Sequence, residues 1–233
     1  MVLSVHQPQY LPWLGFFDKI VKSDCFVFLD TVQYKAREFQ NRNKIRTPQG
    51  WQWLTVPVLS KGKSRQKICE VMIDNSFPWQ KKHWRALNIY YHQAPYFKDY
   101  ADFFESIYKK NWERLIDLNV EIIKYLLSVL EIKTPVYFES EIGTDLTGTD
   151  RIIQICKKKN ADVYLSGIGA KAYLEEEKFN QTGIKLIYQN FIHPKYRQCF
   201  CKDEDSFIPY LSIIDLIFNE GKNSINILKI KNV

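Results

Sequence analysis

Polar and aromatic side chains are concentrated in the stretch HQPQYLPWLG, which begins at His6 and follows an apolar run. His6 can donate to a phosphate or act as a general acid or base, because its reference pKa is about 6.5; a tight turn can also hold it through backbone groups. Gln7 leaves the same run beside it. Tyr10 and Trp13 offer surfaces for stacking a base or sugar, or anchors for the core. Gly15 lets a ligand approach free backbone N–H groups at the start of a predicted helix.

A second polar stretch, DTVQYKAREFQNRNKI, begins at Asp30, the last residue of another apolar run. The Asp30 carboxylate can bind a hydroxyl or an amine of a substrate, or it can cap a turn. Five cations and three amides follow within twelve residues, with Glu38 as the acid among them. This excess of cations favours phosphate binding over a solvated loop. The candidate ligand-binding residues here are Gln33, Asn41, Arg42 and Lys44.

Two later connections contribute small residues and a histidine. Ser166, Gly167 and Gly169 in YLSGIGAKAY follow a predicted strand, and small residues there let the backbone approach an anion. A tight strand-to-helix turn explains them equally well, because their spacing matches neither a P-loop nor a dinucleotide fingerprint. His193 and Tyr196 in IHPKYRQ follow the last predicted strand. The sequence contains no G-x-S-x-G, H-E-x-x-H or cysteine–zinc pattern, and we predict no metal site.

The apolar pattern predicts the elements that position these connections. Residues 2–30 are typical of a strand, a helix and a strand, the order of a parallel βαβ unit, and residues 51–58 of a further strand. Residues 79–131 have helical periodicity throughout, and strands and helices alternate again after residue 134. GTDRIIQICKKKN is expected to form a helix capped by Thr149 or Asp150, and AKAYLEEEKF another helix. We therefore predict one α/β domain over residues 1–233, with an open, mostly parallel, Rossmann-like sheet and a helical insertion at 79–131.

Ligands of such sheets bind where the strands end, near the point at which the strand order reverses. The four polar connections are therefore expected to share one rim. The formal charge of +7 and the isoelectric point near 9.0 favour an anionic partner.

The five cysteines are odd in number, and we interpret them as reduced thiols of a cytoplasmic protein. No apolar run approaches the roughly 18 residues of a membrane span, and no secretory leader is evident, so no membrane span is expected.

The blocks HQPQYLPWLGFFDKI, FLDTVQY, FQNRNKI, WLTVPV, YLSGIGAKAYL and SIIDLIFNEG, in this order, resemble the WbqC-like protein family. The resemblance runs from residue 2 to about residue 221. Members of that family are associated with bacterial O-antigen and other surface-polysaccharide gene clusters. The resemblance implies a role in making or modifying a nucleotide-linked sugar, without implying a particular reaction.

The first block is also similar to the start of nucleotidyltransferases of the HIGH superfamily. Gln7, Pro8, Leu11 and Leu14 match, but the two phosphate-binding histidines of that pattern fall on Tyr10 and Trp13 here, and the glycine between them falls on Pro12. This likeness implies a similar fold and a ligand in the same crevice. It argues against ordinary adenylyl transfer unless His6 and the basic loop stabilise the phosphates.

Together these patterns predict an enzyme of surface-polysaccharide synthesis that acts on a nucleotide-sugar or sugar phosphate. The expected reaction is transfer of an acyl, aminoacyl or nucleotidyl group, with a nucleotide as the candidate cofactor. Arg42 and Lys44, with backbone N–H groups near Gly15 and Gly167, are expected to hold phosphates. His6 and Asp30 are expected to transfer a proton or orient the acceptor.

Two alternatives stay open. One is a nucleic-acid-binding module, against which the scattered lysines and the lack of a known motif argue. The other is a non-catalytic partner of a glycosyltransferase complex, which would use the clustered aromatics of YYHQAPYF in the helical middle of the chain.

Overall fold

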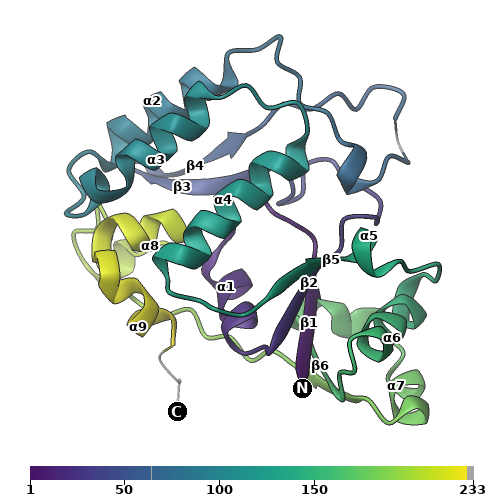
Figure 1. The fold of residues 1–233 in the computed structure, drawn as a ribbon. Coiled ribbons are helices and arrows are strands. Elements are labelled where there is room, and N and C mark those ends of the chain that lie inside the picture. Colours follow the sequence, from purple (N-terminus) through teal and green to yellow (C-terminus); the bar gives the residue numbers. More distant parts are fainter. Residues whose placement is uncertain (64, 230–233) are drawn as a thin grey trace.

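A computed structural model describes residues 1–63 and 65–229 of the chain (Figure 1). Its centre is a sheet of five parallel strands in the order β5-β2-β1-β6-β7. The β2 sequence CFVF is apolar and buried at every position, as expected for a strand covered on both faces. The strands of this sheet are β1 (Val2–His6), β2 (Cys25–Phe28), β5 (Val136–Phe138), β6 (Val163–Ser166) and β7 (Lys185–Tyr188).

The strand order reverses at β1. The chain first builds the sheet outward through β2 and β5, and then returns to the other side of β1 to add β6 and β7. The open parallel sheet predicted from the sequence is therefore confirmed. The reversal lies between the carboxyl ends of β1 and β6, which is where ligands of such sheets bind.

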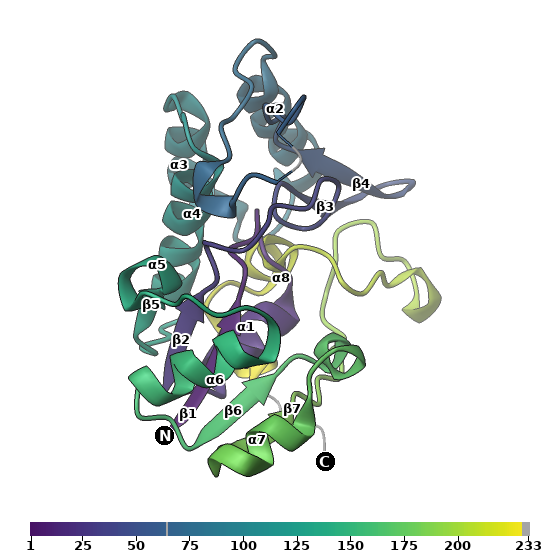
Figure 2. The same cartoon turned by 90° about the vertical axis from the view of Figure 1, so that its right-hand side faces the viewer.

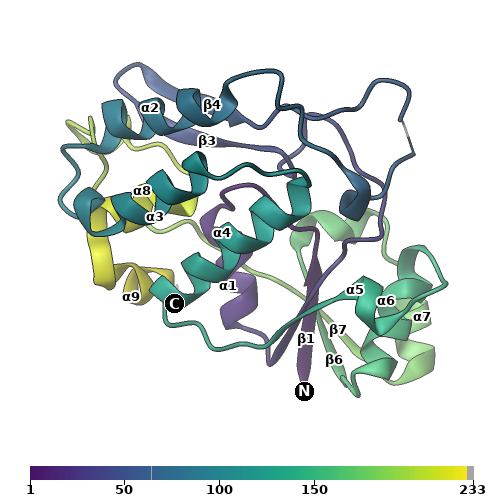
Figure 3. The same ribbon diagram turned by 45° about the horizontal axis from the view of Figure 1, so that its top comes forward.

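Helices cover both faces of the sheet. α1 and α4 lie on one side, and α6 and α7 lie on the other (Figures 1 and 3). The α-helices are α1 (Leu14–Val21), α2 (Trp79–Tyr91), α3 (Phe97–Lys109), α4 (Leu115–Val129), α5 (Glu139–Ile142), α6 (Gly148–Lys158), α7 (Glu176–Thr182), α8 (Ile213–Glu220) and α9 (Ser224–Leu228). Single turns of 3₁₀-helix lie at η1 (Ile68–Glu70), η2 (Ile168–Ala172), η3 (Glu204–Ser206) and η4 (Gly221–Asn223).

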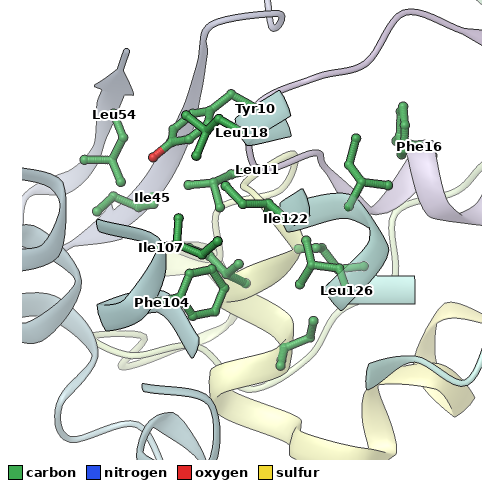
Figure 4. Packing of buried hydrophobic residues seen from close by; sticks show 14 of the residues in the cluster. Tyr10, Leu11, Phe16, Ile45, Leu54, Phe104, Ile107, Leu118, Ile122 and Leu126 are labelled. Atoms are coloured by element: carbon green, nitrogen blue, oxygen red, sulfur yellow. The ribbon is translucent and has the colours of Figure 1, made fainter. Parts of the chain in front are cut away.

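The helical periodicity of residues 79–131 corresponds to α2, α3 and α4. These helices share one apolar cluster with α1 and α8. Figure 4 shows part of this cluster, in which Leu118 and Leu126 of α4 lie near Leu11 of the first loop and Phe104 of α3. The insertion is therefore packed directly onto one face of the sheet region.

A two-stranded antiparallel hairpin, β3 (Arg42–Thr47) and β4 (Gly50–Thr55), lies apart from the parallel sheet (Figure 2). The sequence predicts a strand at 51–58, and the observed strand ends at Thr55. Its partner β3 was not predicted, because its alternation of polar and apolar residues is hidden by a run of cations and amides. Asn43 and Ile45 are nevertheless buried, which gives β3 one inward face.

Two local predictions are wrong. The segment AKAYLEEEKF is not one helix, because η2 ends at Ala172 and α7 begins only at Glu176. Between them, Leu174 packs onto the apolar cluster beneath α6, and the Glu175 N–H donates to Thr149 Oγ1. This bond also explains why Thr149 does not cap α6, which begins at Gly148 after Thr147.

Candidate functional site

A cavity of about 480 Å³ opens at the carboxyl edge of the sheet, where the strand order reverses between β1 and β6. We call it the switch-point cavity. Its walls come from the loops after β1, β2 and β6, from α1 and from the start of α6. Five of the residues predicted from the sequence line it: His6, Gln7, Ser166, Gly167 and Gly169.

His6 ends β1 and contributes a neutral imidazole to the cavity wall. Its Nδ1 lies 2.9 Å from the Gln7 carbonyl oxygen, and because a carbonyl only accepts, Nδ1 must carry the proton. Burial, followed by the charge of Lys19, lowers the pKa of His6 to about 3. Near neutral pH the ring is therefore uncharged, and Nε2 is a hydrogen-bond acceptor.

Lys19 lines the cavity at the switch point, and the sequence patterns did not indicate it. Its side chain runs from the middle of α1 to the end of β1, where Nζ donates to the Val5 carbonyl at 2.9 Å. Lys19 is 3% exposed, and among the described residues no carboxylate forms an ion pair with it. Burial lowers the pKa of Lys19 to about 7. A Cβ placed on Gly167 would lie 3.9 Å from Nζ, so this ammonium sits between the two strand ends.

A buried ion pair borders the other side of the cavity. Arg151, in the first turn of α6, lines the cavity and lies 3.1 Å from the Glu139 carboxylate at the start of α5. Its Nε also donates to the Leu146 carbonyl. Glu139 is fully buried, so this pair fixes the guanidinium at the wall. Arg151 was also missed by the sequence analysis.

The basic stretch after β2 reaches the cavity through Lys35 and Glu38. The Gln40 side chain holds this loop against the first one: its Nε2 donates to Gln7 Oε1 at 2.6 Å, and its Oε1 accepts from the Lys35 N–H at 2.9 Å. Asn119 of α4 donates to the Gln40 carbonyl and so anchors this loop to α4. The two polar loops identified in the sequence are therefore joined at the cavity by side-chain amides.

Asp30 lies beside a different cavity, of about 750 Å³, between the ends of β2 and β5 and the start of α4. Both of its carboxylate oxygens accept hydrogen bonds from Ser140, one from the backbone N–H and one from the hydroxyl. These bonds tie the end of β2 to the first turn of α5. Asp30 and His6 therefore do not face a common cavity.

Of the two aromatic residues of the first loop, Tyr10 packs inside the protein and Trp13 is half-buried. Tyr10 is fully buried in the apolar cluster (Figure 4). Its hydroxyl bonds to His83 Nδ1 and to the Tyr108 hydroxyl. Trp13 packs against Phe191 and Tyr210. A Cβ on Gly15 would overlap the Trp13 ring, since the nearest ring atom lies only 2.1 Å away. The glycine at the start of α1 is thus required by the indole.

The remaining predicted residues lie on other parts of the fold. Arg42 and Lys44 extend over the tryptophans of β4, while buried Asn41 donates to the Val56 carbonyl. Gln33 forms a β-bridge with Lys67.

His193 and Tyr196 belong to the long segment before α8. His193 is surrounded by four aromatic rings, and the Tyr196 hydroxyl donates to buried Asp215.

General rules of α/β folds provide signals for the two missed cations. Lys19 occurs in LGFFDKIV, a helix that is apolar on nearly every side and directly follows β1, so any lysine in it must be buried. Arg151 stands in the first turn of a helix that follows a strand of a parallel sheet, and such helices begin at the carboxyl edge. Neither residue belongs to a cluster of polar residues in the sequence, so the polar clusters did not indicate either of them.

No group of three or more His, Cys, Asp or Glu side chains within residues 1–63 and 65–229 is placed to hold a metal ion. In the same part of the chain, no helix has both the length and the apolar character needed to cross a membrane. All five cysteines are free thiols.

Comparison with known proteins agrees with the resemblance noted in the sequence. The family model described as the WbqC-like protein family matches residues 7–227. The chain belongs to this family. A protein of Mycobacterium tuberculosis described as uncharacterized, Rv1507c, is 35% identical to this WbqC-like chain over 229 residues, which cover 97% of each chain. No solved structure is significantly similar to it.

Proposed function

We propose that this WbqC-like protein is a transferase that binds a nucleotide-sugar or a sugar phosphate in the switch-point cavity. The observation that carries the proposal is the buried ammonium of Lys19, which lacks a carboxylate partner among the described residues. Keeping an unpaired cation buried costs stability, and a phosphate placed beside it offsets that cost. The family resemblance supports surface-polysaccharide synthesis as the setting.

The cavity residues have complementary roles in this proposal. Lys19 and Arg151 hold the phosphates and stabilise the negative charge of a phosphate leaving group. The small residues Gly167 and Gly169 let the backbone approach the same oxygens. Neutral His6 accepts a hydrogen bond from a substrate hydroxyl through Nε2, with Nδ1 fixed by the Gln7 carbonyl.

The proton acceptor in this proposal is Glu38. It lines the same cavity, whereas both oxygens of Asp30 are occupied by Ser140 and face another cavity. A hydroxyl or amine of the acceptor substrate gives its proton to Glu38 as it attacks the group to be transferred. The bond from that group to the donor phosphate breaks, and its electron pair stays on the phosphate beside Lys19 and Arg151. The hydrogen bond between the side-chain amides of Gln40 and Gln7 holds the two loops in place during this step.

The test is a titration with UDP-, GDP-, dTDP- and CMP-linked sugars, followed by calorimetry and thermal melting. A ligand at one hundred times its Kd stabilises the fold by about 2.7 kcal/mol and raises the Tm by roughly 5–10 °C. Lys19→Met is expected to weaken binding at least about tenfold, because a charge-assisted hydrogen bond is lost. Lys22→Met removes a lysine directly after the same helix, which pairs with Asp18 outside the switch-point cavity, and it should leave binding unchanged.

The pH dependence of binding gives a sharper signature. An anion beside Lys19 keeps it protonated, so above pH 7 the wild-type affinity for a nucleotide-sugar should fall toward tenfold per pH unit. The diphosphate of such a ligand does not titrate in this range. Equal slopes in the wild type and Lys19→Met, or no binding from any of the four nucleotide classes, would contradict the proposal.

A further inference from the structure

The net positive charge of the protein comes from one part of the chain. Residues 33–67 contain nine of the 33 lysines and arginines but only one of the 26 acidic residues. This stretch therefore carries a net charge of +8, and the rest of the chain carries a net charge of −1. Most of these cations lie outside the switch-point cavity. Lys35 and Glu38 are the charged residues of this stretch that line the cavity.

The β3–β4 hairpin presents part of this charge together with aromatic rings. The Arg42 guanidinium lies 4.1 Å from the centre of the Trp53 ring, and Lys44 Nζ lies 4.1 Å from the Trp51 ring and 5.3 Å from the Trp53 ring. The Phe39 ring packs 5.9 Å from Trp53. We call these five side chains the hairpin face.

Strand alternation separates the hairpin face from the core. Asn43, Ile45 and Leu54 are buried on the inner side of the hairpin, so Arg42, Lys44 and Trp53 point to the other side. Arg46, the next residue on that side, is buried because its guanidinium donates to carbonyls of residues 199–206. Trp51 is 44% exposed, an unusual state for a side chain of its size. Among the described residues, no carboxylate forms an ion pair with Arg42 or Lys44. The Arg42 guanidinium donates to the Arg37 carbonyl, so neither charge is neutralised by the described part of the chain.

The basic stretch continues beyond the hairpin. Residues 65–68 run beside residues 32–34, because the Tyr34 N–H donates to the Gln66 carbonyl and the Ile68 N–H donates to the Val32 carbonyl. The exposed side chains of Lys61, Lys63, Arg65 and Lys67 follow β4 in this order. The charge therefore extends along a chain segment instead of forming a single point.

We infer that the hairpin face is a binding surface for single-stranded nucleic acid. Successive phosphates match a stretch with nine cations and a single acidic residue, Glu38, and bases stack on exposed aromatic rings whatever their sequence. A membrane is a poorer match, because cations lie over both tryptophan rings and interrupt any apolar patch. An anionic polysaccharide also matches the charge, and a sugar ring can stack on Trp51 through its C–H groups, so heparin is the competing polyanion in the test. The inference is independent of the function proposed for the switch-point cavity.

The test is fluorescence anisotropy of the full chain with labelled twelve-residue oligo(dT) and oligo(U) over a range of salt concentrations. The double variant Arg42→Ala/Lys44→Ala should reduce the slope of log K against log salt by about 1.4, since two phosphate contacts are lost. Trp51→Ala should weaken binding at least about fivefold, and Trp51→Phe should restore most of it, because a phenyl ring still stacks. Circular dichroism establishes that each variant is folded.

The matched control is Lys133→Ala/Lys157→Ala, which removes two exposed lysines outside residues 33–67 and should leave the slope unchanged. Lys19→Met should also leave oligonucleotide binding unchanged, which distinguishes this surface from the switch-point cavity. The inference is overturned if the oligonucleotides do not bind, if both double variants change the slope equally, or if Trp51→Ala binds as the wild type does. Binding only to anionic phospholipid vesicles or only to heparin would overturn it as well.

Discussion

The switch-point cavity and the hairpin face both use lysine and arginine, but they surround these cations with opposite environments. In the cavity, Lys19 is buried with one carbonyl as its partner, and Arg151 is held by a fully buried carboxylate. On the hairpin face, Arg42 and Lys44 lie over indole rings at the protein surface. The first arrangement fixes two charges in space, and the second leaves them accessible to solvent.

This difference shows that the surroundings of a cation decide what it can bind. A buried ammonium keeps little hydration, so a single phosphate gains much from it and its position can be selective. Exposed cations over aromatic rings gain little from each anion and are screened by salt, so they act in numbers. The cavity therefore suits one small ligand, while the hairpin face suits a long polyanion.

The largest effect on stability is expected from the buried pair at the cavity wall. Arg151→Met leaves the Glu139 carboxylate buried without its cation, and the free energy of unfolding should fall by about 3–5 kcal/mol. Denaturant unfolding measures the loss. Arg114→Met, which breaks the exposed pair with Asp117, is the control and should cost about 1 kcal/mol or less. Equal losses in the two variants would show that burial does not distinguish the cavity cations.

The pH dependence of stability should identify Lys19 as a buried cation. Its pKa is about 7 in the folded protein, below the ordinary value of a lysine, so between these values the unfolded chain binds more protons. The contribution of Lys19 therefore raises the free energy of unfolding with increasing pH, by up to about 1.4 kcal/mol per unit. The window is pH 7 to 8.5. The α-amino group and the cysteines also titrate near this window, and they contribute equally to the wild type and to a variant that lacks only the Lys19 ammonium.

The measurement is the difference between the wild type and Lys19→Met across that window. Methionine carries no charge, so the variant should lack the rise, and it should be more stable than the wild type at pH 6. A wild-type curve parallel to that of the variant would mean that Lys19 is solvated, and the comparison with the hairpin would lose its basis.

The smallest effect is expected on the hairpin. Arg42→Met and Lys44→Met should each change the free energy of unfolding by less than about 1 kcal/mol, because an exposed cation over an aromatic ring contributes little. Urea unfolding followed by tryptophan fluorescence measures both. A loss as large as that of Arg151→Met would show that these cations hold the hairpin together.

Much of the parallel sheet could be predicted from the sequence. Its strands are continuous apolar runs such as CFVF, and the helices between them show a period of 3.6 residues, so both signals are local. The β3 strand escaped prediction because Arg42, Lys44 and Arg46 occupy its alternate positions, and such a row resembles a loop until β4 is placed beside it.

The candidate site was predicted in part. His6 and Gly167 follow strands whose ends meet, and the rule for parallel sheets was sufficient to bring them together. Tyr10 shares the loop of His6 yet packs into the interior, and Trp13 is half-buried against Phe191, because a loop residue can turn either way and its sequence does not say which. The role of Asp30 beside Ser140 depends on residues that are 110 positions apart.

The sequence by itself determined the strands of the parallel sheet and most of the helices, the polar loops that follow the strands, and the resemblance to the WbqC-like family. These properties are contained in short windows of residue type and spacing. Only the tertiary structure decided that Lys19 is buried between two strand ends, that Asp30 faces another cavity, and that the cations of β3 lie over the tryptophans of β4. Solvent exposure and charge pairing depend on residues far apart in the chain, and folding alone brings them together.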